Sequence, residues 1–236
     1  MSLTRSLLVG AAVYVVTYCC AVGADSLEVV IQGRLGDTDL AAFSIGETVA
    51  STAAALDFMW FGVLARVSRA VGAGSARRSA AALKMGWCLS VAVGIPLMGL
   101  GLACAEPILR LFKPTPAVLA VAAPFLRVHL LGLVPAELLG CSLAALQALR
   151  HPLIFAALYL GAAVAEAGSN WVAVCVLKAG TLGSGAVSAM RNTLFAALAC
   201  SAFFTCGGAS AGAGRRAVGA LVRRVRLRHL PAAQLE

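Results

Sequence analysis

Charged side chains are scarce in this sequence. Asp, Glu, Lys and Arg make up 12% of its 236 residues, whereas hydrophobic residues make up 61%. Soluble domains carry about twice this share of charge, and the mean hydropathy here is +0.91. The composition therefore excludes an ordinary soluble domain and predicts a protein whose solvent is the lipid bilayer.

Acidic residues are fewer than basic ones, 10 against 19, which gives a net charge of +9. A basic chain can bind nucleic acid, but here the basic residues lie in short segments between apolar runs. No aromatic residues are interleaved with them to stack on bases. We therefore expect a membrane partner and no nucleic-acid partner.

Recognisable chemical motifs are also missing. The eight cysteines lack CxxC spacing, and the three histidines are not spaced as metal ligands. No set of nucleophile, base and orienting group stands out. The sequence thus favours a protein that is not an enzyme and has neither a metal site nor a cofactor.

Six apolar runs are present, joined by short polar segments, and a helix of roughly 20 apolar residues crosses the hydrocarbon core. The sequence predicts an all-α membrane protein with six transmembrane helices within residues 1–206. Residues 207–236 are expected to form a glycine-rich linker and a basic amphipathic helix on the inner membrane surface. The predicted spans cover approximately 7–31, 40–64, 80–105, 118–148, 153–177 and 186–206.

The distribution of Lys and Arg predicts the orientation. If the N-terminus is inside, thirteen of these residues in the turns and termini fall on the inner side and four on the outer side. Cytoplasmic segments carry the excess of positive charge. Both termini are therefore expected in the cytoplasm, in a membrane that the sequence does not specify.

The stretch EVVIQGRLGDTDLAAFSIG, Glu28–Gly46, reads as the end of one span, a tight turn and the start of the next. Gly33 and Gly36 permit turn conformations that other residues avoid. Glu28 precedes the apolar residues 29–31, so we expect it to face a cavity inside the protein. The alternative is a solvated carboxylate at the level of the lipid headgroups.

Other polar residues also fall within predicted spans. Glu47 and Asp57 are ten residues apart in one run, and Glu166 precedes Asn170 by one helical turn. Buried carboxylates in membranes mark ion or proton pathways. The alternative for Glu47 and Asp57 is a structural pairing with an arginine or with nearby hydroxyl groups.

Glycine and proline mark the turns and bends. Gly72 and Gly74 lie in the arginine-rich stretch RVSRAVGAGSARRS, which is typical of a cytoplasmic turn and lacks the context of a nucleotide site. Pro96 and Pro135 lie inside predicted spans, where proline bends or breaks a helix.

Four segments together resemble multidrug and toxic compound extrusion (MATE) transporters, with the DinF-like branch nearest. They occur in that family's order and cover nearly the whole chain. The family's fold implies two six-helix lobes around a central cavity, and this chain resembles the N-terminal lobe only. The segments are GRLGDTDLAAFSIG, RAVGAGSARRSA, PILRLFKPTPAVLAVAAPFLRVHLLGLVPAELL and SNWVAVCVLKAGTLGSGAVSA.

The resemblance implies a cation-coupling site. Glu28 matches the family's acid in the first helix, although aspartate is usual there. In the fifth helix the family pattern resembles an Asn followed four residues later by an Asp. Here Asn170 is present, but Val174 stands at the later position. Glu166, one turn before Asn170, is a candidate to replace the missing carboxylate.

These features predict a half-size or truncated exporter. H⁺ or Na⁺ as the coupling ion would drive export of an organic or xenobiotic compound through alternating access. Desolvation favours the neutral form of a carboxyl group, so a cavity acid can exchange protons. Transport would require a second lobe, from a second copy or a missing C-terminal half. The alternative is a non-transporting fragment or a half-lobe that regulates a full-length transporter.

Overall fold

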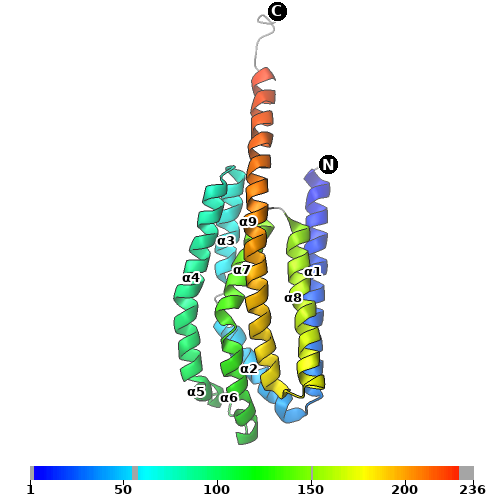
Figure 1. The fold of residues 1–236 in the computed structure, drawn as a ribbon, viewed down its shortest axis with the longest axis vertical. Helices are drawn as coiled ribbons and strands as arrows, with labels where there is room; N and C mark the ends of the chain where they lie inside the picture. The colour runs from blue at the N-terminus through cyan, green and yellow to red at the C-terminus, as the bar shows by residue number, and fades with distance from the viewer. Residues whose placement is uncertain (1–2, 55–57, 150, 229–236) are drawn as a thin grey trace, which may run out of the picture.

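The computed structural model describes the backbone of residues 3–54, 58–149 and 151–228, and the side chains of 11–54, 59–149 and 151–205. Within these ranges every regular element is a helix, which confirms the all-α prediction. Figure 1 shows a bundle of long helices packed side by side. The elements are α1 Leu3–Gly33, α2 Asp37–Ala53, α3 Phe58–Gly72, α4 Ala76–Ala103, α5 Ala105–Arg110, α6 Pro116–Leu130, α7 Leu133–Ala148, α8 Pro152–Trp171, the π-helical turn η2 Val172–Val176 and α9 Gly180–Arg228.

Several helices are long and apolar enough to cross a membrane. Within the described residues, four qualify alone, and α6 with α7 forms a bent pair that can act as a fifth span. The chain is thus a multi-pass membrane protein, while the predicted count of six spans is not established. The four single spans are Ala11–Gly33, Ala76–Ala103, Pro152–Val176 and Gly180–Thr205.

The second predicted span is not one continuous helix. We expected a helix over residues 40–64, but α2 ends at Ala53 and α3 begins at Phe58. Before this break, the hydroxyl groups of Ser51 and Thr52 both donate to the carbonyl oxygen of Thr48, at 3.1 and 2.7 Å. Such bonds can compete with the helical ladder, but Ser44 and Thr48 make the same kind of bond within the continuous part of α2. Asp57 lies outside the described residues, so its predicted role stays a prediction.

The bend between α6 and α7 has an identifiable cause. The two helices meet at an angle of 46°. Pro135 lies one turn beyond the break and has no N–H to donate to the carbonyl group of Leu131, four residues earlier. Pro96, the other proline expected to bend a helix, lies inside α4, which continues from Ala76 to Ala103.

The glycine turns lie at opposite ends of the bundle. Gly33 and Gly72 are the last residues of α1 and α3. Gly36 and Gly74 follow with φ angles of 116° and 66°, in the region that favours glycine. In Figure 1 the α3–α4 turn lies at the end of the bundle where α1 begins, and the α1–α2 turn lies at the other end.

Residues 207–236 were expected to be separate from the last span. The bounds of α9 extend to Arg228 and so include the glycine-rich stretch. The side chains beyond Thr205 lie outside the described part, and the predicted linker and surface helix remain predictions.

Two apolar clusters hold the bundle together. One joins α3, α4, α7 and α9 around residues such as Val67, Leu83 and Leu146, and the other packs α2 against α6. Phe125 of α6 is fully buried between two glycines, Gly46 of α2 and Gly185 of α9. A Cβ atom at position 46 would lie 2.6 Å from the Phe125 ring, so α2 and α6 can approach this closely only because of the glycine.

Candidate functional site

A row of polar side chains runs along one face of α9. Its members are spaced three or four residues apart, so they share one side of the helix. Four of them are buried with at most 8% of their surface exposed, and Arg191 is about one-fifth exposed. The row consists of Thr181, Ser184, Ser188, Arg191 and Asn192.

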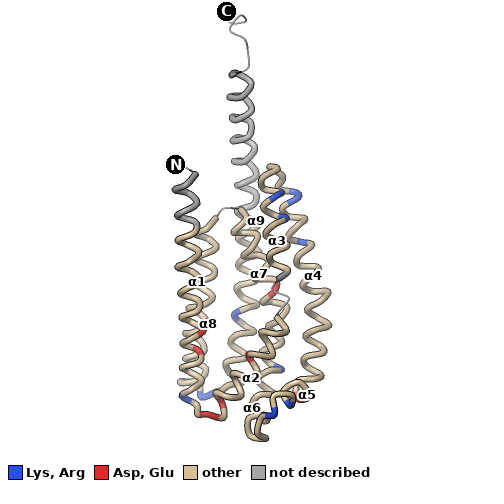
Figure 2. The backbone as a smooth tube through the Cα atoms, turned by 180° about the vertical axis from the view of Figure 1, so that it is seen from behind, with Lys and Arg blue, Asp and Glu red and all other residues tan. Residues whose placement is uncertain are grey.

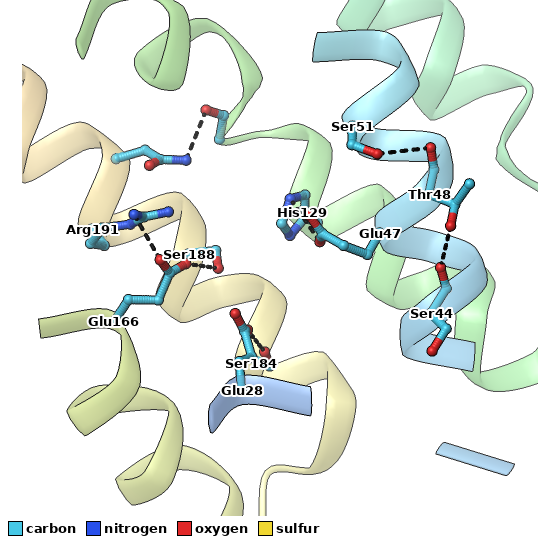
Figure 3. Close-up of polar contacts among 12 residues, drawn as sticks. Glu28, Ser44, Glu47, Thr48, Ser51, His129, Glu166, Ser184, Ser188 and Arg191 are labelled. Carbon is cyan, nitrogen blue, oxygen red and sulfur yellow. Dashed lines mark hydrogen bonds and ion pairs between the residues drawn. The ribbon is translucent and has the colours of Figure 1, made fainter. Parts of the chain in front are cut away.

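Glu28 of α1 contacts this row and α8 at the same time. Its Oε1 atom accepts a hydrogen bond from Asn170 Nδ2 at 2.7 Å and another from Ser184 Oγ at 2.9 Å. Asn170 is fully buried and Glu28 is partly buried. Figure 3 shows the Glu28 carboxylate directed at Ser184. One carboxylate thus links α1, α8 and α9.

Glu166 makes a second contact between α8 and α9, one turn away from the first. Its Oε1 atom accepts from Ser188 Oγ at 2.8 Å, and its Oε2 atom lies 2.7 Å from Arg191 Nη1. Figure 3 shows Glu166, Ser188 and Arg191 together. The ion pair satisfies the charge of Glu166 inside the bundle, so this carboxylate is tied to a structural partner.

Oxygen atoms near Glu28 are suited to a small hard cation. Asn170 Oδ1 is buried and has no hydrogen-bond partner among the described residues. With the Glu28 carboxylate and the Ser184 hydroxyl it could supply oxygen ligands of the kind that Na⁺, like other hard cations, prefers. No cluster of three or more His, Cys, Asp or Glu that could bind a metal occurs in the described part of the chain.

The backbone is irregular directly after Asn170. The turn η2, Val172–Val176, is π-helical, and such turns occur often at functional sites. Val174 lies in this turn with 3% of its surface exposed. An apolar side chain therefore occupies the position where the resemblance implies an aspartate.

Glu47 lies in a separate polar contact. Its Oε2 atom is 3.6 Å from His129 Nε2, so the pair links α2 to α6. Ser44, Thr48, Ser51 and Thr52 are exposed on α2 beside Glu47, and Figure 3 shows three of them along that helix. The opposite face of α2 is buried against α6. The exposed face is therefore polar although the helix lies within an apolar bundle.

The structure brings together three of the five coupling candidates: Glu28, Asn170 and Glu166. Glu47 lies on another pair of helices, and Asp57 is outside the described residues. Sequence reasoning missed Ser184, Ser188 and Arg191. The signal that could have found them is the polar spacing of three to four residues in the final apolar run, with an arginine in its middle.

A cavity of about 230 Å³ lies between α1, α3, α7 and α8. Aromatic side chains form much of its wall, and Tyr14, Phe155 and Tyr159 are stacked in sequence at ring distances of 6.0 and 5.7 Å. Aromatic faces attract cations and pack against planar organic groups. The aromatic lining residues are Tyr14, Tyr18, Trp60, Phe155 and Tyr159.

Residues 14–172, more than half of the chain, match the family model MatE. The chain belongs to the MatE family. The resemblance inferred from its motifs is confirmed, while the DinF-like branch stays a prediction. No curated relative matches the sequence.

Solved structures agree with the MatE assignment at the level of the fold. A crystal structure of MATE in complex with MaD3S superposes with a TM-score of 0.77 at 13% identity, and covers 83% of this chain and 44% of that chain. A MOP superfamily transporter from Pyrococcus furiosus gives a TM-score of 0.65 at 15% identity, with coverage of 84% and 42%. The chain thus spans less than half the length of these matched MATE and MOP proteins.

Proposed function

We propose that this chain is one lobe of a cation-coupled antiporter that exports organic compounds, and that Glu28 carries the coupling ion. The observation that supports this most directly is the position of Glu28. Its carboxylate lies in an apolar span and holds α1 against α8 and α9 through Asn170 and Ser184. Carboxylates inside membrane spans mark ion and proton routes.

The contacts of Glu28 suggest how ion binding changes the lobe. When the carboxylate is charged, Asn170 Nδ2 and Ser184 Oγ both donate to it. Protonation removes the negative charge that strengthens these bonds. Na⁺ would instead engage the carboxylate together with Asn170 Oδ1. In either case occupancy changes the balance of contacts between α1 and its two neighbours, and this couples the ion to a helix movement.

The proposed cargo is an organic or xenobiotic molecule with an aromatic or cationic part. The aromatic cavity between α1, α3, α7 and α8 is suited to such groups. It shares α1 and α8 with the Glu28 site. The same two helices would therefore respond to both the coupling ion and the cargo.

Transport by alternating access requires a second lobe, either a second copy of this chain or a C-terminal half. The exposed polar face of α2 supports this requirement. Ser44, Thr48, Ser51 and Thr52 are exposed there, and polar groups that face lipid are costly. Each of these hydroxyl groups donates to a carbonyl group of α2 itself, so water in a central cavity or a second lobe would pair with their remaining acceptor positions. Parallel lobes related by an axis along the membrane normal can share one orientation.

Dye efflux from proteoliposomes tests the proposal. With an imposed proton or sodium gradient, the wild-type chain with its second lobe is expected to export a cationic dye, and Glu28→Gln is expected to abolish the gradient dependence. Asp25→Asn is the matched control, since Asp25 lies one turn away on α1 and is exposed. Gradient-dependent efflux at the full rate by Glu28→Gln would refute the role of Glu28.

A non-transporting, regulatory half-lobe is the second candidate. Val174 at the position of the expected aspartate favours it. On this hypothesis, the chain reconstituted alone, as a monomer or as an oligomer of identical copies, shows no efflux. It also predicts a change in the efflux of a full-length MATE transporter when the two are reconstituted together.

A further inference from the structure

The turn between α3 and α4 combines positive charge with a groove. No Asp or Glu occurs between Asp57 and Glu106, a stretch that contains four arginines and one lysine. Figure 2 shows Lys and Arg gathered at this end of α3 and α4. A groove of about 350 Å³ lies between the two helices there.

The two walls of the groove have the same pattern. Each helix contributes residues at positions i, i+3, i+4 and i+7, which share one face. Arginines lie at the rim, and four alanines leave room between the helices. The residues are Arg66, Arg69, Ala70 and Ala73 from α3 and the turn, and Arg78, Ala81, Ala82 and Met85 from α4.

The arginines of this groove lack acidic partners. Among the described residues, none of Arg66, Arg69 and Arg78 forms an ion pair with a carboxylate. Arg66 Nη1 contacts the sulfur of Met85 at 2.8 Å. A thioether is only a weak acceptor. Three guanidinium groups therefore converge on one groove with their charge unneutralised.

The groove lies near the helix ends, where membrane-spanning helices meet the lipid headgroups. Arg66 precedes the end of α3 by six residues and Arg78 is the third residue of α4, so both lie within about 9 Å of the helix ends at 1.5 Å per residue. Met85 at the inner end of the groove and Leu89, one turn further along α4, are both exposed. An apolar surface thus continues from the basic rim towards the hydrocarbon core, as a lipid with a charged headgroup requires.

We propose that the α3–α4 groove binds the phosphate group of an anionic phospholipid. Arg66, Arg69 and Arg78 hold the phosphate by charge-assisted hydrogen bonds. The four alanines accommodate the headgroup, and Met85 and Leu89 contact an acyl chain. Basic pockets between transmembrane helices bind such headgroups. This site is separate from Glu28, and it does not depend on the chain being a transporter.

Native mass spectrometry of the full chain, with phosphatidylglycerol and phosphatidylcholine of equal acyl length, tests the proposal. We expect a single retained phosphatidylglycerol with at least about tenfold preference. Arg69→Gln/Arg78→Gln should weaken binding at least about tenfold, since each basic residue near an anionic surface contributes about fivefold. Arg77→Gln/Lys84→Gln removes the same charge from residues that do not line the groove, and should change binding less than about threefold.

Three outcomes would overturn this inference. Equal binding of the two lipids would show that the headgroup charge is not recognised. Equal losses in the two charge-matched variants would show a diffuse surface effect. Displacement of the lipid by millimolar inorganic phosphate would make the groove a site for a soluble anion. If the groove variant does not fold, the wild-type chain still tests the proposal. A preference for phosphatidylglycerol over phosphatidylcholine that salt weakens would support it, and equal binding of the two lipids would overturn it.

Discussion

Arg191 of α9 and Glu166 of α8 form an ion pair at 2.7 Å between two helices that can each span a membrane. Arg191 thereby neutralises the Glu166 carboxylate, one of the two acids that contact the polar face of α9. Glu28 of α1 contacts α8 and α9 one helical turn away from this ion pair. It accepts two hydrogen bonds and has no ion pair among the described residues. The two acids are therefore not equivalent, and the one without a basic partner is the better candidate to bind an exchangeable cation.

Loss of Arg191 should destabilise the protein. In Arg191→Gln the Glu166 carboxylate remains buried without its cation, which we expect to lower the free energy of unfolding by about 2 kcal/mol, because the pair is partly exposed and a fully buried pair costs more. Unfolding in a mixed detergent titration measures this. Glu166→Gln/Arg191→Gln should recover at least half of the loss, and a double variant as unstable as the sum of the single ones would contradict the pairing.

Gly46→Ala should also destabilise the bundle. The added methyl group would lie 2.6 Å from the ring of Phe125, which is fully buried and cannot move away freely. Overpacking of this kind costs about 1 to 3 kcal/mol, measured by thermal unfolding in detergent. The matched control is Gly62→Ala, where nothing lies within 4 Å of the added atom. Equal melting temperatures for the two variants would contradict the close packing of α2 on α6.

Pro135→Ala should reduce the bend between α6 and α7. Alanine restores an N–H that can donate to the carbonyl group of Leu131 and lets the helix continue. Spin labels at Ala117 and Gly140 are expected to move apart by a few ångströms when the 46° angle decreases. Pro96→Ala, in the continuous helix α4, serves as the control and should leave the distance unchanged. A bend that persists fully in Pro135→Ala would assign it to packing against α9.

Accessibility of introduced cysteines should report the orientation. In a background without the native cysteines, labels at Asp37 and Thr115 are expected to react from the outside, and a label at Ser75 only from the inside. The charge distribution of the sequence predicts these sides, and the bundle places the α1–α2 and α3–α4 turns at opposite ends. Labelling of Ser75 from the outside, with protection of Asp37, would reverse the predicted topology.

Composition and local pattern were enough to predict the class of protein and its helical fold. The apolar runs predicted a protein of the lipid bilayer. The residues GRLGDTDL predicted a turn, and Gly36 in this turn has a positive φ angle. The break after α2 was not predictable from hydropathy, because residues 40–64 read as one apolar run in the sequence. Pro135 indicated a bend, but its size of 46° is a property of the packed helices.

The pairings in the candidate site required the tertiary structure. The sequence alone determined that Glu28 and Asn170 are polar residues in apolar spans, and helical periodicity assigns each of them to one face of its helix. It does not determine which faces meet. Glu28 lies 142 residues from Asn170 and 156 from Ser184. Only the packing of α1 on α8 and of α8 on α9 decides that these groups share a hydrogen-bonded contact and that Arg191 pairs with Glu166. Helices that pack together bring buried polar groups to the partners that stabilise them.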